Sequence, residues 1–158
     1  MNAIELFFNT IQSGNLENVR LQIKNNPEII NQRDNRGFTP LIFATYFGKN
    51  DIAKLLISQG ADINAKDASG NSALMGVCFK EQVEMAKILI DNNADINLTN
   101  NSGVSALIFS TQYQKIKSIE LLLKHQADKT IQDQTGQTAL DYAKTNQLPE
   151  NIVNALSS

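Results

Sequence analysis

The sequence predicts an all-α protein made of stacked helix-turn-helix units that are joined by β-turn loops. The first observation behind this prediction is a period of 33 residues, which relates the glycines Gly37, Gly70, Gly103 and Gly136. The same step relates the leucines Leu41, Leu74, Leu107 and Leu140, and also the aspartates Asp62, Asp95 and Asp128. A fixed period of this length is typical of a repeat array, in which each unit buries its apolar face against its neighbours.

We therefore expect one domain, residues 1–158, made of five units. Residues 1–33 are predicted to be an N-terminal capping repeat, residues 34–66, 67–99 and 100–132 three full repeats, and residues 133–158 a C-terminal capping repeat. The last unit is expected to end on a short helix that Pro149 opens. Terminal units of an array differ from the others because their outer faces meet water.

The first unit predicts two helices. An apolar stripe at helical spacing marks the first helix and consists of Ile4, Phe7, Phe8 and Ile11. Asn2 and Glu5 have the spacing of a capping box at its start, and Gly14 is expected to end it. The second helix is predicted from the stripe Leu16, Val19, Leu21 and Ile23.

The second repeat, residues 34–66, shows the local signals most clearly. Asp34 and Gly37 predict a tight turn, because Asp can bond its own backbone and Gly supplies a positive φ. Thr39 is placed to cap a short helix, and Pro40 stands where its missing N–H costs nothing. Gly48 ends that helix. The buried faces of the two helices are predicted to be Leu41, Ala44, Ile52, Ala53, Leu55 and Leu56.

Later units replace the glycines that end the helices of the second unit. The positions of Gly48 and Gly60 are taken by Glu81 and Asn93 in the third unit, and by Gln114 and Gln126 in the fourth. Asn tolerates the left-handed conformation fairly well, whereas Glu does not. We therefore expect either a strained backbone at Glu81 or a different turn.

These residues together resemble the ankyrin repeat. The matching motifs in the second unit are Gly37-x-Thr39-Pro40-Leu41, Ala44, Gly48, Leu55-Leu56 and Gly60-Ala61-Asp62-Ile63-Asn64. The resemblance covers nearly the whole chain and implies an ankyrin-repeat solenoid. It also implies a Thr-Pro-Leu-His motif whose His braces the repeats by hydrogen bonds, but here that position holds Ile42, Met75, Ile108 and Asp141. Burial of the three apolar copies is expected to replace the polar brace in part.

Composition and charge exclude several classes of protein. The chain has 14 basic and 16 acidic residues and no basic stripe, which argues against a nucleic-acid partner. A single cysteine excludes an intramolecular disulfide framework. No apolar run approaches the roughly 20 residues that span a bilayer, and the N-terminus lacks the basic segment of a signal peptide. We expect a soluble cytoplasmic protein that is monomeric alone and has no membrane partner.

The residues offer little catalytic chemistry. Cys78 is expected in a first helix, where the side chain of Lys80 points elsewhere, so a structural cysteine is favoured. His125 is expected at a helix end, where the dipole favours it without any catalytic role. The repeated aspartates indicate scaffold, and neither zinc-ligand nor phosphate-binding motifs are present. We therefore predict that the chain is not an enzyme and holds no cofactor or metal.

The resemblance implies where a partner would bind. In the ankyrin family, the β-turn tips and the first helices form a concave groove whose variable positions contact partners. Carried onto this sequence, the partner-binding residues are Asn35, Arg36, Phe38, Tyr46, Phe47, Ser69, Asn71, Phe79, Lys80, Ser102, Val104, Gln112 and Tyr113. Five of the ten Phe and Tyr residues stand at these positions, and aromatic side chains are frequent anchors of protein interfaces.

We therefore predict a non-catalytic protein–protein interaction module that binds a partner protein through the concave groove of repeats two to four. It would act as an adaptor, an inhibitor or an immunity-type factor. The alternatives are a small-ligand binder or an improvised enzyme around Cys78 and His125, and a self-associating structural element. Some of the aromatic residues could also pack against a neighbouring repeat instead of a partner.

Overall fold

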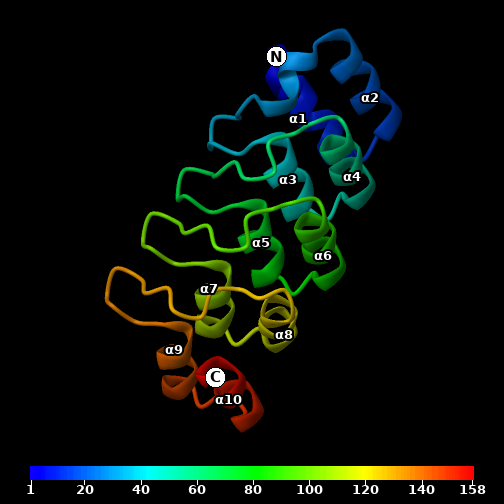
Figure 1. Cartoon of the computed structure of the whole chain (residues 1–158). Coiled ribbons are helices and arrows are strands. Elements are labelled where there is room, and N and C mark those ends of the chain that lie inside the picture. Colours follow the sequence, from blue (N-terminus) through cyan, green and yellow to red (C-terminus); the bar gives the residue numbers. More distant parts are fainter. The chain divides into compact units, whose positions relative to one another are not determined.

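The computed structural model describes all 158 residues, which form ten α-helices, one short 3-10 helix and no β-strand (Figure 1). The all-α fold class predicted from the sequence is confirmed. The chain divides into two compact units, Met1–Ala73 and Leu74–Ser158. The single domain and its repeat boundaries stay a prediction.

The first unit contains four α-helices and the 3-10 helix. Their bounds are Ala3–Ser13 for α1, Leu16–Asn25 for α2, Pro27–Asn31 for the 3-10 helix η1, Pro40–Tyr46 for α3 and Asn50–Ser58 for α4. Helix α1 lies beside α3, and α2 lies beside α4 (Figure 1). This is the arrangement of stacked helix pairs that the 33-residue period predicts.

Helix α1 begins and ends as predicted. Oδ1 of Asn2 accepts a hydrogen bond from the backbone N–H of Glu5 at 2.8 Å, and the Glu5 carboxylate accepts one from the Asn2 N–H at 3.2 Å. Gly14 follows the helix with a left-handed φ of 77°. These two signals in the sequence were therefore sufficient to place both ends of the helix.

The prediction for α2 is wrong at one residue. Val19 and Ile23 are buried, but the Leu21 side chain is 45% exposed. Leu21 stands two residues from each of them, which places it about 200° around a helix of 3.6 residues per turn. It therefore points away from the face that α2 buries.

The second compact unit, Leu74–Ser158, contains six helices. The first residue of α5, Ala73, still belongs to the first compact unit. The bounds of the six helices are Ala73–Phe79 for α5, Val83–Asp91 for α6, Ala106–Gln112 for α7, Ile116–Lys124 for α8, Ala139–Thr145 for α9 and Glu150–Ser157 for α10. Helix α7 contacts α8 and α9, α6 contacts α8, and α10 contacts both α8 and α9. The short helix predicted after Pro149 is thus present and packs on its own unit.

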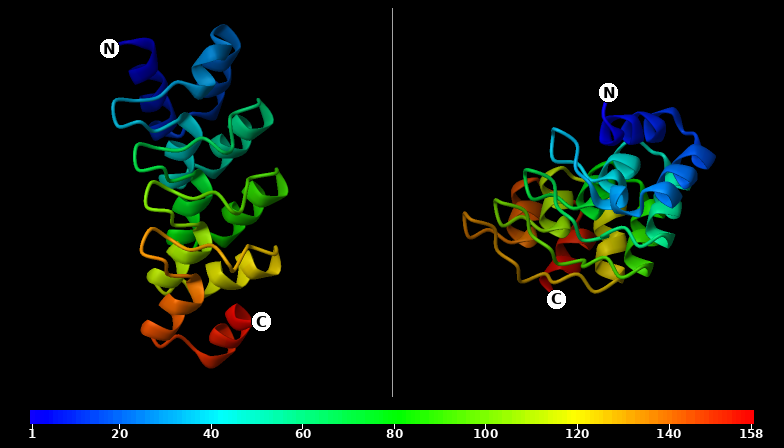
Figure 2. Two further views of the ribbon diagram at one scale, coloured as in Figure 1. Left: turned by 60° about the vertical axis from the view of Figure 1, so that its left-hand side comes forward. Right: turned by 90° about the horizontal axis from the view of Figure 1, so that it is seen from above.

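Each unit contains two β-turn tips, and every tip begins with an Asp or Asn residue. These four residues are Asp34, Asp67, Asn100 and Asp133. Each accepts backbone N–H groups from the second and the fourth following residue at 2.8–3.1 Å. In Figure 2 the loops that carry the tips extend to one side of the helices within each unit. A side chain that accepts hydrogen bonds from two backbone N–H groups of its own turn holds that turn in one conformation.

Neighbouring tips approach each other closely within each unit, and this requires glycine. A Cβ on Gly37 would lie 3.3 Å from the backbone N of Ala68, and one on Gly103 would lie 3.2 Å from that of Gln134. Both glycines also have a positive φ, of 82° and 73°. A larger residue would therefore be strained in its backbone and crowded by the next tip.

The helix-ending turns keep a left-handed backbone even where glycine is absent. Gly48 and Gly60 have φ values of 69° and 89°. The residues at the same positions in the second unit have φ values of 54° for Glu81, 70° for Asn93, 58° for Gln114 and 62° for Gln126. Of the two outcomes expected at Glu81, the structure therefore shows an unchanged turn with an unfavourable backbone conformation.

The positions that lack the family histidine are filled in two ways. Ile42, Met75 and Ile108 are 6%, 1% and 1% exposed, so apolar burial takes the place of the polar brace there. Asp141 is exposed, and its carboxylate accepts the backbone N–H of Thr138 at 2.9 Å in a capping box. Asp141, the fourth residue at this position, therefore caps the start of α9.

Candidate protein-binding surfaces

Most of the residues predicted to contact a partner are accessible. Eight are exposed, namely Asn35, Arg36, Tyr46, Phe47, Ser69, Lys80, Ser102 and Tyr113. Four are half-buried, namely Phe38, Asn71, Phe79 and Gln112. Their accessibility is compatible with binding, and their contact with a partner stays a prediction.

Val104 differs from the other predicted contacts because the structure buries its side chain, and its contact with a partner stays a prediction. Its side chain is only 6% exposed. Its backbone N–H donates to Oδ1 of Asn100 at 3.1 Å, and its carbonyl accepts from the Asn100 N–H at 3.0 Å. Because both backbone groups are held by the turn, an apolar side chain at this place can leave water only by turning inward, and Val104 does so.

Four aromatic side chains form the first aromatic cluster: Phe38 on the preceding tip, Phe43 and Tyr46 on α3, and Phe47 just after α3. Ring centroids lie 4.6 Å apart for Phe43 and Phe47, 5.1 Å for Tyr46 and Phe47, and 6.2 Å for Phe38 and Tyr46. Phe43 is buried and also contacts Phe8 of α1 at 5.2 Å, edge to face. The exposed rings therefore stand on a buried ring that fixes them to the core.

Arg36 is held against the first aromatic cluster. Its guanidinium donates two hydrogen bonds to Oδ2 of Asp34, at 2.9 and 2.7 Å. The same group lies 4.9 Å from the ring centroid of Phe38 and 5.5 Å from that of Phe43. An ion pair and two cation–π contacts thus fix a side chain that is still 52% exposed.

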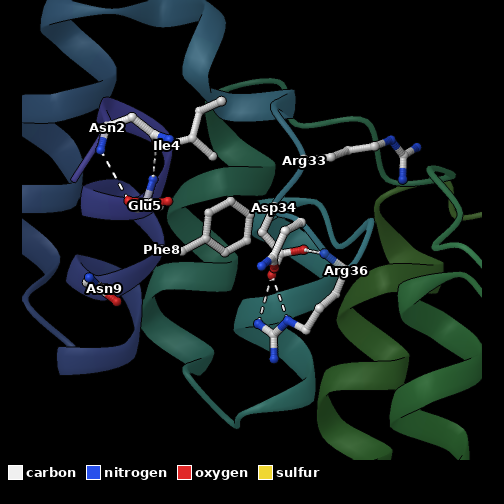
Figure 3. A pocket seen from close by; sticks show the side chains of 9 residues that line it. Asn2, Ile4, Glu5, Phe8, Asn9, Arg33, Asp34 and Arg36 are labelled. Carbon is white, nitrogen blue, oxygen red and sulfur yellow. Dashed lines mark hydrogen bonds and ion pairs between the residues drawn. The ribbon is translucent and has the colours of Figure 1, made fainter.

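A pocket of about 360 Å³ lies in the first unit, between α1 and the first tip (Figure 3). It is lined by Asn2, Ile4, Glu5, Phe8, Asn9, Arg33, Asp34, Asn35 and Arg36. The charged side chains around it already have partners: Glu5 bonds Asn2, Asp34 pairs with Arg36, and Arg33 donates to two backbone carbonyls. The lining therefore presents the apolar side chains of Ile4 and Phe8 between satisfied polar groups.

Three aromatic side chains form the second aromatic cluster, which lies in the second unit: Phe79 on α5, Phe109 on α7 and Tyr113 just after α7. The ring centroids lie 5.0 Å apart for Phe79 and Tyr113, 5.1 Å for Phe109 and Tyr113, and 5.5 Å for Phe79 and Phe109. Tyr113 is 52% exposed, and the two phenylalanines are half-buried. The rings therefore pack on one another and leave an apolar platform at the surface.

The backbone beside the second aromatic cluster is fixed by α9. The side-chain amide of Asn146, which follows α9, donates to the carbonyls of Thr111 at 3.2 Å and Gln112 at 3.3 Å. These carbonyls stand at the C-terminal end of α7, where intrahelical donors run out, and the Thr111 carbonyl also accepts the backbone N–H of Gln114 at 3.2 Å. The second aromatic cluster thus lies beside a helix end whose carbonyls accept hydrogen bonds from the side chain of Asn146.

Sequence reasoning missed two members of the clusters, Phe43 and Phe109. Both stand four residues before another aromatic residue on the same helix face, Phe47 and Tyr113 respectively. Side chains at this spacing are neighbours on a helix. The repeated Phe-x-x-x-aromatic pattern was therefore the signal that identifies the ring on which each exposed aromatic residue rests.

Cys78 and His125 do not form a catalytic arrangement. Cys78 is fully buried, and burial raises the pKa of its thiol to about 12, so it remains protonated at neutral pH. His125 is half-buried at the end of α8, where Nδ1 lies 3.0 Å from the carbonyl oxygen of Leu121. The thiol therefore lacks the accessible thiolate that a nucleophile requires, and the imidazole is engaged with its own helix.

The repeated aspartates hold loops together. The backbone N–H of Asp62 donates to Oδ1 of Asn31 at 2.9 Å, and that of Asp128 donates to Oδ1 of Asn97 at 2.9 Å. The Asp62 carboxylate accepts from the N–H two residues later. No group of three or more His, Cys, Asp or Glu side chains suited to a metal ion is present. These residues act as scaffold.

Repeated helix pairs, joined by ordered tips, define the molecule as a helical repeat protein. The family described as "Ankyrin repeats (3 copies)" matches residues 5–67 and 74–158, and the one described as "Ankyrin repeats (many copies)" matches residues 46–90. The chain belongs to the ankyrin-repeat family. No helix has the combination of length and apolar character that crossing a membrane requires.

Curated relatives resemble only part of the chain. Protein phosphatase 1 regulatory subunit 27 of Homo sapiens and that of Mus musculus are each 52% identical over 52 residues, which is 33% of this chain and 33% of each relative. DNA-binding protein RFXANK of Homo sapiens is 37% identical over 49 residues, which is 31% of this chain and 19% of the relative. The matches span a third or less of these relatives. The family and a regulatory-subunit relative point to a non-enzymatic interaction module.

Proposed function

We propose that this chain is a non-catalytic module that binds a partner protein through the aromatic side chains beside its β-turn tips, on repeats two to four of the predicted array. Each aromatic cluster is proposed as a binding surface of its own unit. Regulation of the partner, as an adaptor or an inhibitor, is the role that the proposal assigns to binding. It is consistent with a relative whose name describes a regulatory subunit.

The observation that carries the proposal is the exposure of aromatic rings on fixed supports. Tyr46, Phe47 and Tyr113 are 41%, 38% and 52% exposed, although each contacts a less exposed ring within its own cluster. Aromatic side chains have few rotamers to lose, so they bury a large area on binding at a low cost in entropy. An exposed ring that is already held in place needs little ordering when a partner arrives.

A small-ligand site or an enzyme around Cys78 and His125 is less well supported. The thiol is buried and protonated, and the pocket in the first unit is lined by charged groups that are already paired. Protein binding through the aromatic clusters uses side chains that the fold leaves accessible. It is therefore the function that the geometry supports best.

The experiment is a pull-down from source-cell lysate with immobilised wild-type chain and two double variants. Tyr46→Ala with Phe47→Ala removes the exposed part of the first aromatic cluster, and Phe79→Ala with Tyr113→Ala removes most of the second. The matched control is Leu6→Ala with Leu21→Ala, which removes apolar side chains that are 50% and 45% exposed outside the clusters. Circular dichroism establishes that every variant is folded.

We expect a protein that the wild type and the control retain and that at least one cluster variant loses. The cluster whose substitution abolishes retention is then the binding surface, and the protein that the wild type retains is the partner. A partner that all variants retain, or one that only the Leu6/Leu21 control loses, would contradict the proposed surfaces. Wild-type chain that retains no protein and instead grows in size with concentration would favour the self-associating alternative.

A further inference from the structure

We infer that the second aromatic cluster binds a linear acidic segment of its partner, in which a bulky apolar side chain contacts the rings and a neighbouring carboxylate pairs with Lys115. This inference rests on the proposed function and adds the chemistry of the partner to it. Two observations support it independently: the placement of the Lys115 ammonium group, and the packing of the three rings.

Lys115 is held in a defined place beside the rings. Its backbone N–H donates to the carbonyl of Ser110 at 2.8 Å, and its own carbonyl accepts from Ile119 at 3.0 Å at the start of α8. Its Nζ lies 5.4 Å from the ring centroid of Phe79. The backbone bonds hold the base of the side chain, and the cation–π contact places the ammonium group over the Phe79 ring.

The positive charge of Lys115 is not neutralised within the protein. No ion pair includes Lys115. Helices α5 and α7, which carry the rings Phe79 and Phe109, contain no charged residue. The platform therefore combines an apolar surface with a cation, Lys115, that lies over the Phe79 ring, and an approaching carboxylate would find a partner there.

The acidic residues of the neighbouring turns are used in other ways. Asp133 accepts hydrogen bonds from the Tyr142 hydroxyl and from its own tip, and Asp141 caps α9. Glu81 is half-buried in the turn after α5 and makes no ion pair with Lys115. Because these carboxylates do not compensate Lys115, charge complementarity favours an acidic partner and disfavours a basic one.

The packing of the rings excludes a second way of using an aromatic cluster. Rings that bind a cation surround an open space, but here every pair of rings among Phe79, Phe109 and Tyr113 has centroids within 5.5 Å. The rings thus touch each other and leave no cage, and a cation of the protein itself already lies against Phe79. The remaining surface fits an apolar side chain laid flat against it.

The test is a selection of random linear peptides, about twelve residues long, displayed on phage and captured on the immobilised chain. We expect the selected peptides to contain Asp or Glu next to Trp, Phe or Leu. The tightest one is then synthesised, and its affinity is measured by fluorescence anisotropy. Its Kd should rise about tenfold or more with Lys115→Glu and should also rise with NaCl concentration.

Three variants control the measurement. Lys115→Arg keeps the charge and should keep the affinity within about threefold, because Arg also makes cation–π contacts. Lys124→Glu makes the same change of charge at the exposed far end of α8 and should leave the Kd unchanged. Tyr113→Ser removes the most exposed ring of the cluster and should weaken binding, and because Tyr113 is half in solvent this variant should stay folded.

The outcomes separate this inference from the proposed function. Selected peptides that lose binding with Tyr113→Ser but are basic or uncharged would overturn the acidic partner and leave the binding surface in place. Acidic peptides whose binding is indifferent to both Lys115→Glu and Tyr113→Ser would contradict the inference and the surface together. A selection that returns no peptide would overturn the claim that the segment is linear.

Discussion

Asp133 is a carboxylate of the second unit that accepts several hydrogen bonds. It is buried and accepts hydrogen bonds from the backbone of Thr135 and Gln137, from the Thr135 hydroxyl and from the Tyr142 hydroxyl. Burial acts to raise its pKa, but these hydrogen bonds to the charged form outweigh burial and lower the pKa to about 2. The tip that leads into α9 is therefore built around a charged group.

We predict that Tyr142→Phe destabilises the chain by about 1–3 kcal/mol at neutral pH, because it removes one donor from a buried carboxylate. Urea unfolding followed by circular dichroism measures the change. Tyr113→Phe removes a hydroxyl from a ring that is 52% exposed, and it should change the stability by less than about 0.5 kcal/mol. Equal effects of the two substitutions would contradict this role of Tyr142.

Because of the lowered pKa of Asp133, we predict that the stability of the chain depends on pH. The Asp133 carboxylate has a pKa that is lower in the folded chain than the ordinary value of 3.8, so the stability that it contributes is present above pH 3.8 and is lost as the pH falls toward 2. The difference between wild type and Tyr142→Phe should therefore shrink across this range. A difference that stays constant from pH 7 to pH 2 would show that the hydroxyl does not act through the charge of Asp133.

Two glycines with open space around them test the cost of the left-handed turns. A Cβ on Gly48 or on Gly76 would meet no atom within 4 Å, but only Gly48 has a left-handed φ, of 69°. Gly48→Ala should therefore cost about 1–2 kcal/mol. Gly76→Ala, inside α5, should stabilise the chain by up to about 1 kcal/mol. Urea midpoints that move in the same direction for both variants would contradict this account.

At the residue scale, the sequence predicted the signals that act within one turn. The capping box of Asn2, the cap at Thr39 and the turn at Gly37 depend on chemistry within four residues, and all three are present. The exposure of Leu21 and the burial of Val104 were not foreseen, because burial depends on which neighbour a side chain meets. The φ of Glu81 could not be decided from the sequence, because the packing of the surrounding turn overrides the preference of a single residue.

At the scale of helices, the units differ in how much they bury. Helix α3 buries six of its seven residues, whereas α9 buries only the small side chains of Ala139 and Ala143, and α10 buries Ile152 and Leu156. The free energy gained from burial grows with the apolar area removed from water. The last helix pair, α9 and α10, therefore gains little free energy from burial.

We predict that residues 100–158 open before the rest of the second unit, with α9 and α10 first. Repeat arrays gain stability from each unit and from each interface between neighbours, so a terminal pair with little buried area opens most easily. Hydrogen exchange measured by mass spectrometry should show early deuteration of these helices. Uniformly slow exchange through residues 100–158 would contradict the prediction.

The elements themselves were largely predictable, because one signal recurs in each repeat. The period of 33 residues and the helical stripes placed the helix pairs, and Pro149 marked the last helix. The hydrogen bonds from Asp62 to Asn31 and from Asp128 to Asn97 were not predicted. Each joins residues 31 positions apart, and a pattern of single residues does not show which loop meets which.

At the scale of the whole molecule, membership of the ankyrin-repeat family explains the fold, and the accessible aromatic residues are the feature on which the proposed function rests. The candidate surfaces were predicted only in part. Their exposed members stand at positions that the resemblance to the ankyrin repeat pointed to, whereas the buried Phe43 and the half-buried Phe109 support them and were not predicted. Partner identity depends on complementary chemistry in another molecule, which the sequence of this chain does not contain.

The most direct test of the central claim is calorimetric titration of the captured partner into wild type, each double cluster variant and the Leu6→Ala/Leu21→Ala control. We predict that one cluster variant loses about 2 kcal/mol or more of binding free energy, as expected when an aromatic anchor is truncated, and that the control matches wild type. Equal affinities for the wild type and both cluster variants would contradict the claim that this protein acts through its aromatic clusters.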